Sequence, residues 1–182
     1  SLERLGTDRL DLYLLHWEGR HPLEETIAAF EELVDEGLIL RWGVSNIDLK
    51  TMRKMMRMEG GDQCAANQVL YHPGTRGIEF DLLPWSRARD MPVMAYSPLG
   101  RGRLLNEPIL KQIADRHDAT PAQIALAMVL RQDGIIAIPK ASSVEHVELN
   151  AAALEIRLDD EDIAALDRAF PPPTSEQPLD VI

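Results

Sequence analysis

Short apolar segments recur five times along the chain, each followed by a small polar cluster and then by a stretch with helical periodicity. Strands that alternate with helices in this way favour a parallel sheet covered by helices. Five such units predict the α/β class and most of an eight-unit (β/α)8 barrel of the TIM type. The apolar segments are Leu10–Leu15, Arg41–Val44, Ala65–Tyr71, Pro92–Ala95 and Ile135–Ile138.

Helix signals fill the intervals between these strands. Thr120, Pro121 and Gln123 combine an N-cap, a first-turn proline and a capping-box glutamine. Ser142, with Glu145 three residues later, predicts a capping box for the following helix. We expect helices from Pro22 up to Gly37, from Asp48 up to Gly60, over Glu79–Arg89 and Glu107–His117, from Thr120 up to Gly134, from Ser142 to Leu154, and from Asp159 to Phe170.

Other segments lack regular patterns. Ser97–Arg103 is rich enough in glycine and proline to predict a long irregular loop. The residues after Pro171–Pro173 are expected to be frayed. Ser1–Gly6 has the pattern of the tail of a helix, so we interpret residues 1–182 as one incomplete barrel domain. Such an open sheet would expose two edges, and we therefore expect aggregation or a partner that completes the barrel.

Composition narrows the function classes. The formal net charge of −11 disfavours binding to nucleic acid, although Arg101, Arg103 and Lys111 form a basic patch sufficient for one small anion. No apolar stretch approaches the roughly 20 residues of a spanning helix, so we expect no membrane association. The single cysteine, Cys64, excludes an intramolecular disulfide and favours a reducing compartment such as the cytoplasm.

Polar residues stand where the strands end, and in a parallel barrel these ends converge on one face. His16 can donate a hydrogen bond to a carbonyl oxygen and pass a proton, or it can be a histidine satisfied at the barrel rim. Ser45, Asn46 and Gln68 complement a carboxamide, although asparagine also caps loops. Tyr96 can stack on a flat ring or belong to the core.

Two later segments suit phosphate groups. The Ser97–Arg103 loop combines small residues, exposed backbone and two arginines, which favours a pyrophosphate. Lys140 precedes a helix opened by Ser142 and Ser143, so a cation and helix-start amides could lie beside a phosphate. No cluster of residues suggests a metal site.

Motifs in this order resemble those of the aldo-keto reductases, and the likeness covers nearly the whole chain. It is greatest to bacterial members that reduce small aldehydes such as methylglyoxal. It implies a (β/α)8 barrel, of which this chain would hold strands four to eight, and hydride transfer from NADPH to a small carbonyl substrate. The motifs are Leu12–Trp17 (LYLLHW), Trp42–Asn46 (WGVSN), Asn67–Pro73 (NQVLYHP), Ala95–Gly100 (AYSPLG) and Ile138–Ser142 (IPKAS).

The resemblance also implies roles for single residues. His16 would be the catalytic histidine that orients the substrate carbonyl. Ser45, Asn46 and Gln68 would hold the nicotinamide carboxamide, and Tyr96 would stack on the nicotinamide ring.

The rest of the dinucleotide would meet residues of the last two units. Ser97 and Leu99 would meet the pyrophosphate, Lys140 the 2′-phosphate side and Asn150 the adenine. Where many relatives carry an arginine that clamps the 2′-phosphate, this chain has His146. A neutral imidazole supplies no permanent charge, so NADH is not excluded as the cofactor.

The family's catalytic aspartate, tyrosine and lysine come from earlier units, and nothing in this chain matches them. Tyr13 and Tyr71 belong to strand motifs and do not take the tyrosine's role. Without this general acid, worth about 10²- to 10⁴-fold in rate, we expect the isolated chain to be inactive. Two alternatives are a non-catalytic nucleotide-binding or regulatory module of the same fold, and an unrelated barrel enzyme with a phosphate site after its last strands.

Overall fold

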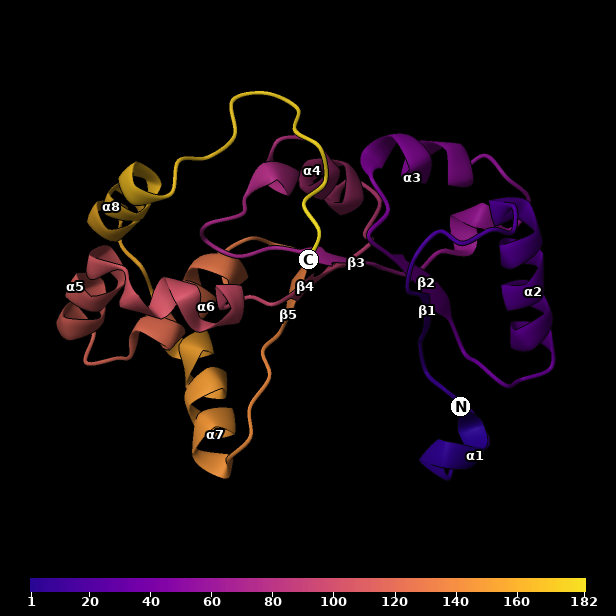
Figure 1. The fold of residues 1–182 in the computed structure, drawn as a ribbon, viewed down its shortest axis with the longest axis horizontal. Coiled ribbons are helices and arrows are strands. Elements are labelled where there is room, and N and C mark those ends of the chain that lie inside the picture. Colours follow the sequence, from indigo (N-terminus) through magenta and orange to yellow (C-terminus); the bar gives the residue numbers. More distant parts are fainter. The chain divides into compact units, whose positions relative to one another are not determined.

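The computed structural model describes residues 1–182, which separate into two compact units, residues 1–68 and 69–182. The five strands form a sheet whose order follows the chain, and each described pairing is parallel. The predicted α/β class with a parallel sheet is confirmed (Figure 1). The strands are β1 (Tyr13–Leu15), β2 (Trp42–Ser45), β3 (Asn67–Leu70), β4 (Val93–Tyr96) and β5 (Ile135–Ile138).

In the first unit, an aromatic cluster fixes a helix on the strands. Phe30 of α2 stacks on Trp42 of β2 with ring centroids 5.2 Å apart, and Tyr13 of β1 meets Phe30 edge-on at 6.0 Å. The Trp42 indole N–H donates to Glu31 Oε1 at 2.6 Å, so its polar atom is satisfied although the ring is buried. The helices of this unit are α1 (Leu2–Leu5), α2 (Leu23–Asp35), α3 (Leu49–Met55) and the 3-10 turn η1 (Gly61–Gln63).

The helix after β2 is shorter than its apolar pattern predicts. Asp48 caps α3 as expected, because its Oδ1 accepts the Thr51 N–H at 2.7 Å. The helix ends at Met55, however, and tight turns follow before Gly60. The chain then folds back against the end of α3, where a Cβ at position 61 would collide with the Met55 carbonyl oxygen. Gly61 therefore permits a close backbone approach rather than simply stopping a longer helix.

In the second unit, three helices share a core. Leu110 and Ile113 of α5, Ile124 of α6 and Leu166 of α8 are fully buried in one apolar cluster. The Thr120–Gln123 capping box and the Asp159 cap that open α6 and α8 are present as predicted. The helices are α4 (Leu82–Arg87), α5 (Pro108–Arg116), α6 (Pro121–Leu130), α7 (Val144–Ala152) and α8 (Asp160–Ala169), with 3-10 turns η2 (Gly77–Glu79), η3 (Gly100–Asn106) and η4 (Ala153–Glu155).

The prediction of a single helix over Glu79–Arg89 is wrong. The structure has η2 up to Glu79 and then a separate helix that begins at Leu82, with Asp81 as its cap. Pro84 explains the break, because a proline cannot donate to the carbonyl four residues earlier and fits only in the first turn of a helix. Phe80 lies outside both elements and is exposed.

Two predictions at the ends of elements are also corrected. The cap of α7 is Ser143, whose Oγ accepts the His146 N–H at 3.2 Å, and not Ser142. In the Ser97–Arg103 segment, expected to be wholly irregular, residues 100–106 form 3-10 turns interrupted at Arg101 and Gly102. Both interrupting residues have positive φ, which breaks the helical run.

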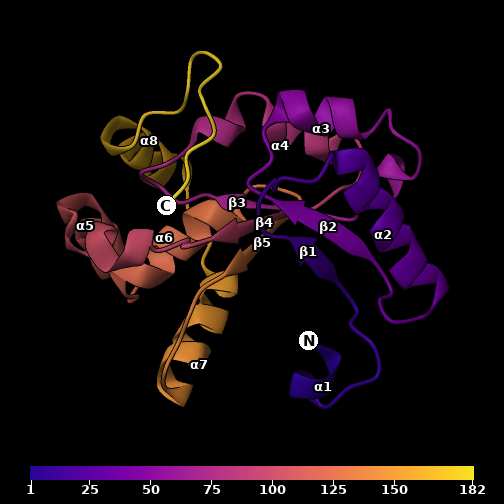
Figure 2. The ribbon, with the colours of Figure 1, turned by 45° about the vertical axis from the view of Figure 1, so that its right-hand side comes forward.

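The segment after α8 has no helix or strand, yet it is not simply frayed. From α8 it arcs away and then turns back toward the strands (Figures 1 and 2). Its last residues, Asp180–Ile182, line a cavity together with residues of the loop after β4. Pro171–Pro173 end the helix, as the sequence predicts.

Candidate functional site

In the first unit, the carboxyl ends of β2 and β3 bring three of the predicted residues into one hydrogen-bonded cluster. The Gln68 carbonyl oxygen accepts both the Ser45 hydroxyl and the Asn46 backbone N–H, each at 2.9 Å. The Asn46 side-chain amide donates to Ser45 Oγ at 3.1 Å and to the His16 carbonyl oxygen at 3.3 Å. These bonds tie the end of β1 to the ends of the next two strands.

Backbone geometry supports this cluster. Asn46 has a φ of 59°, a left-handed conformation that asparagine tolerates better than most residues. The buried Asn67 donates from Nδ2 to the Ile47 carbonyl oxygen at 2.7 Å and so holds the turn after β2 against β3. The side chain of Gln68 is half-buried and has no hydrogen bond to another residue. Its carboxamide can therefore pair with a ligand.

The imidazole of His16 is exposed and lies 5.7 Å from the Trp17 ring, centroid to centroid. It is joined to the cluster through its backbone carbonyl. His16 thus stands at the carboxyl end of β1 as predicted.

In the second unit, Tyr96, Ser97 and Leu99 follow one another out of β4. Burial raises the pKa of the Tyr96 hydroxyl, and a hydrogen bond with the backbone of Ile182 and the charge of Arg101 act against this rise. Ser97 has a φ of 48°, so the chain turns sharply directly after the strand. The Gly100 N–H then donates to the Ser97 carbonyl oxygen at 2.9 Å, which closes the turn.

A cavity of about 390 Å³ lies beside this turn. Ser97, Arg101 and Arg103 line it, as does His72 from the segment after β3. Two guanidinium groups and a serine suit an anion. Of the basic patch predicted from sequence, the two arginines line this cavity, whereas Lys111 belongs to α5 and does not.

Lys140 and Asn150 lie elsewhere in the second unit. Lys140 follows β5 and is exposed, three residues before the Ser143 cap of α7. Asn150 is half-buried in the last turn of α7, and neither residue lines the cavity beside Ser97. His146 is exposed on α7.

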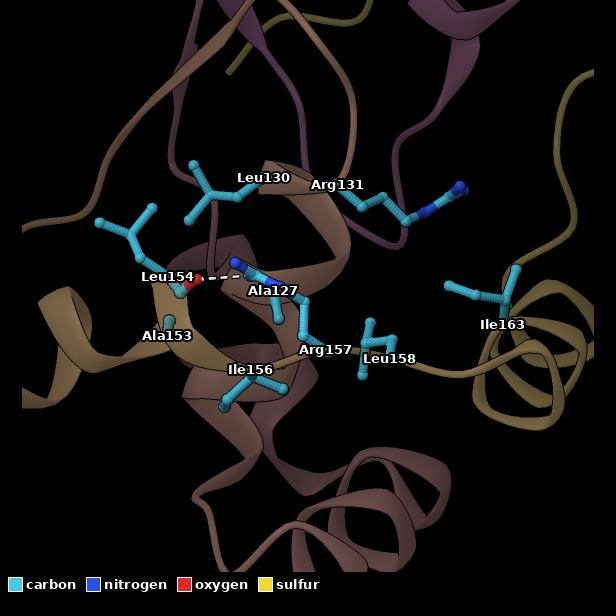
Figure 3. Close-up of a pocket in the computed structure, with 9 residues that line it drawn as sticks. All are labelled: Ala127, Leu130, Arg131, Ala153, Leu154, Ile156, Arg157, Leu158 and Ile163. Atoms are coloured by element: carbon cyan, nitrogen blue, oxygen red, sulfur yellow. Dashed lines mark hydrogen bonds between the residues drawn. The ribbon is translucent and has the colours of Figure 1, made fainter.

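A second open cavity, of about 490 Å³, lies between α6, η4 and α8 (Figure 3). Leu154, Ile156 and Ile163 give it an apolar lining, and Arg157 Nη1 donates to the Leu154 carbonyl oxygen at 2.7 Å. None of the residues predicted to bind cofactor or substrate lines it. We therefore place the candidate site at the strand ends and not in this larger cavity.

Other features of the chain offer no competing site. Burial raises the pKa of the Cys64 thiol to about 12, so this side chain is an unreactive packed thiol at neutral pH. No group of histidine, cysteine and carboxylate side chains is arranged to hold a metal ion. None of the helices is both long enough and apolar enough to span a bilayer.

Sequence reasoning missed His72, Arg76 and Asp180. Arg76 is buried, forms ion pairs with Glu79 and Asp167, and donates to the Phe170 carbonyl oxygen. Its partners on α8 are more than 90 residues away in the sequence, which leaves no local signature. His72 lies directly before Pro73 in the Asn67–Pro73 motif, and its place in that motif is the only sequence signal that points to it.

Each unit by itself holds groups whose chemistry suits a part of the dinucleotide that the resemblance implies. The first unit offers the half-buried side-chain amide of Gln68 beside the hydrogen-bonded pair Ser45 and Asn46. The second offers an aromatic ring at the end of β4 and a cavity lined by two arginines. The first unit by itself thus offers a partner for a carboxamide, and the second by itself offers a stacking surface and an anion pocket.

Comparisons with known proteins identify relatives of this chain. The Escherichia coli protein named methylglyoxal reductase YeaE is 51% identical over 187 residues, which cover 100% of this chain and 66% of that protein. The Bacillus subtilis protein named glyoxal reductase is 35% identical and is matched over 92% of this chain and 59% of its own length. This chain thus spans about two thirds of the length of the curated relatives it matches.

One solved structure is similar to this chain over the whole length of the chain. The aldo/keto reductase of Klebsiella pneumoniae, crystallised with NADP and acetate, superposes with a TM-score of 0.97 at 52% identity and covers 100% of this chain and 66% of that chain. That solved relative has the (β/α)8 barrel. Residues 1–170 match the aldo/keto reductase family as a whole. The chain therefore belongs to the aldo/keto reductase family.

Proposed function

We propose that this chain carries the cofactor-binding residues of an NADPH-dependent reductase that converts small aldehydes or ketones to alcohols. The observation that carries the proposal is the cluster of His16, Ser45, Asn46 and Gln68 at adjacent strand ends. These are residues of motifs that stand in the order of the family. Relatives named methylglyoxal reductase and glyoxal reductase support a small carbonyl compound as the substrate.

Each residue has a task in this proposal. The side chains of Ser45, Asn46 and Gln68 bind the carboxamide of the nicotinamide, and the hydrogen bonds of Ser45 with the Gln68 backbone and with the Asn46 amide fix the Ser45 and Asn46 side chains for this contact. Tyr96 supports one face of the ring. His16 donates to the substrate oxygen and polarises the carbonyl. When bound, NADPH supplies the hydride.

The remaining contacts concern the phosphates and the adenine. Ser97 and Leu99 hold the pyrophosphate at the turn after β4, Lys140 faces the 2′-phosphate, and Asn150 contacts the adenine. Crystal structures of the Klebsiella relative with NADP or NADPH support this choice of cofactor. Because His146 brings no permanent charge, we expect a smaller preference for NADPH over NADH than a paired arginine would give.

We further propose that the isolated 182-residue chain binds NADPH but does not turn over, since no residue in it matches the aspartate, tyrosine and lysine of the family. The protein would act in the cytoplasm, in keeping with its one free cysteine.

Titration of the purified chain with NADPH, followed by tryptophan and nicotinamide fluorescence, tests the binding. Gln68→Ala should weaken binding about 5- to 20-fold, the loss expected for one or two hydrogen bonds. Gln112→Ala, an exposed glutamine on α5, is the matched control and should leave binding unchanged.

Aldehyde-dependent oxidation of NADPH by the same preparation should be absent. Equal binding by Gln68→Ala and the parent chain would contradict the cofactor site. Measurable turnover of methylglyoxal by this chain alone would contradict the proposed inactivity.

A further inference from the structure

A buried asparagine holds the turn that carries the Asn46 side chain. Asn67 is fully buried on β3, and its Nδ2 donates to the Ile47 carbonyl oxygen at 2.7 Å. The pairing of Val44 with Asn67 places this side chain beside the end of β2. No protein donor reaches the Asn67 Oδ1 atom, so the bond to Ile47 is the one hydrogen bond that the side chain makes. The polar part of this residue therefore serves the turn after β2.

The backbone of this turn requires such a restraint. Asn46 has a φ of 59°, a conformation that is costly for a residue with a side chain and persists only where the surroundings hold it. On one side of the turn, the Asn46 N–H donates to the Gln68 carbonyl oxygen at 2.9 Å. On the other side, Asn67 holds the Ile47 carbonyl oxygen. Two neighbouring residues of β3 thus clamp the left-handed residue from both ends.

The direction of the Asn46 side chain depends on this clamp. In the left-handed conformation, its amide donates to Ser45 Oγ at 3.1 Å and to the His16 carbonyl oxygen at 3.3 Å. Release of the Ile47 carbonyl would let the backbone relax toward the extended region, which lacks the cost of a positive φ. The Asn46 amide would then turn away from both acceptors. The cluster would lose its geometry although each of its own side chains is still present.

We propose that Asn67 is a positioning residue for the nicotinamide carboxamide, which acts through the turn at Asn46 and Ile47 and not by contact with the cofactor. The inference rests on the proposed function for the identity of the ligand. Its own content is that Asn67 keeps Asn46 in the left-handed conformation. An apolar side chain would pack at this buried position without an unpaired oxygen, so the stability of the packing alone does not favour asparagine there.

NADPH titration of the full 182-residue chain compares Asn67→Leu with Ile27→Ala. The first variant removes the donor at similar volume, and the second opens a cavity at a buried position of α2, in the same unit but away from the turn. Asn67→Leu should bind NADPH about three- to tenfold more weakly, the effect of a few misplaced hydrogen bonds. Ile27→Ala should lower the urea midpoint at least as much and leave the NADPH affinity unchanged, as measured where urea unfolding shows each variant to be folded.

A ligand without the nicotinamide separates the two ends of the cofactor. ADP-ribose 2′-phosphate carries the adenine and phosphate groups and has no carboxamide. The parent chain, Asn67→Leu and Ile27→Ala should therefore bind it equally. Equal weakening of NADPH and ADP-ribose 2′-phosphate in Asn67→Leu would contradict a role at the carboxamide.

Asn67→Asp places a donor that depends on pH at the same position. Burial raises the pKa of a carboxyl group, and the protonated group can donate to the Ile47 carbonyl oxygen, whereas the carboxylate cannot. The NADPH affinity of Asn67→Asp, relative to the parent at each pH, should therefore recover as the pH falls from about 8 to about 6. Asn67→Leu should show no such recovery.

Amide hydrogen exchange gives a readout that needs no cofactor. The amides of residues 46–52 should exchange faster in Asn67→Leu than in the parent and in Ile27→Ala. Unchanged exchange or unchanged NADPH affinity in folded Asn67→Leu would overturn the inference, as would an equal loss of affinity in Ile27→Ala. Failure of both Asn67 variants to fold would also overturn it, since the fold itself would then require the residue. A parent chain that binds no NADPH would refute the proposed function, and the exchange result would still decide the role of Asn67.

Discussion

Arg76 holds three segments of the second unit together through one buried guanidinium. Nε and Nη2 donate to the two carboxylate oxygens of Glu79 at 2.8 and 2.7 Å, and Nη1 donates to Asp167 Oδ1 at 2.7 Å. The Tyr71 hydroxyl donates to the same Glu79 carboxylate at 2.6 Å. Burial and this carboxylate raise the pKa of Tyr71, which stays a neutral donor. The side chains after β3 and on α8 therefore form one network.

Removal of Arg76 should cost far more than removal of a surface arginine. Arg76→Leu leaves the Glu79 and Asp167 carboxylates and the Phe170 carbonyl without their partner, so we expect a loss of about 3–5 kcal/mol in the free energy of unfolding. Urea unfolding followed by circular dichroism measures this. Arg168→Leu, which changes an exposed arginine on α8 beside Asp167, should change it by less than about 0.5 kcal/mol. Similar small losses for both variants would contradict the role of the network.

At the scale of the element, the two neighbouring serines before α7 are not equivalent. Ser143 caps the helix and Ser142 does not. Ser143→Ala should lower the free energy of unfolding by about 0.5–2 kcal/mol, because the His146 N–H loses its acceptor. Ser142→Ala should stay within about 0.5 kcal/mol of the parent chain in the same urea experiment. A larger loss for Ser142→Ala than for Ser143→Ala would instead indicate that Ser142 is the cap, as the sequence pattern predicts.

The elements that the sequence predicts well are those whose signals are local. The Thr120–Gln123 capping box, the Asp159 cap and the apolar segment of β5 depend on residues within a few positions of each other, and the structure has them. The single helix expected over 79–89 does not form, because Pro84 is compatible only with the first turn of a helix and α4 begins at Leu82. The path of the segment after α8 could not be predicted, because its contacts with Arg76 and Tyr96 join residues distant in sequence.

In the candidate site, too, the sequence predicts the features that depend on local signals. The strand ends were predictable, since a polar residue after an apolar run marks the carboxyl end of a strand. The hydrogen bonds among Ser45, Asn46 and Gln68 follow from the register of β2 on β3, which pairs Ser45 with Gln68. The roles of these residues in binding cofactor stay predictions.

At the scale of the whole molecule, β5 ends the sheet and pairs only with β4. Ile136 on this strand is 47% exposed, and α7, which follows it, has no buried residue and exposes Val144 at 75% and Val147 at 57%. An unpaired edge beside an apolar helix face favours association with other strands. The interpretation of residues 1–182 as a single incomplete domain stays a prediction.

We therefore expect the 182-residue chain to self-associate as its concentration rises. Ile136→Lys places a charge on the open strand and should raise the monomer fraction several-fold in sedimentation velocity. Phe80→Lys, which changes an exposed apolar residue away from the strand, is the matched control and should leave association unchanged. A chain that stays monomeric across the whole concentration range would contradict the expectation.

The left-handed backbone at Asn46 and Ser97 also bears on how this chain could evolve. Both residues have positive φ directly after a strand, a conformation that costs a residue with a side chain of the order of 1 kcal/mol or more. Glycine at Ser97 would remove that cost, so selection for heat resistance alone would favour it. Selection for a ligand contact would retain the serine. The relative frequency of serine and glycine at position 97 among natural variants would therefore show whether selection for stability or for ligand binding is stronger.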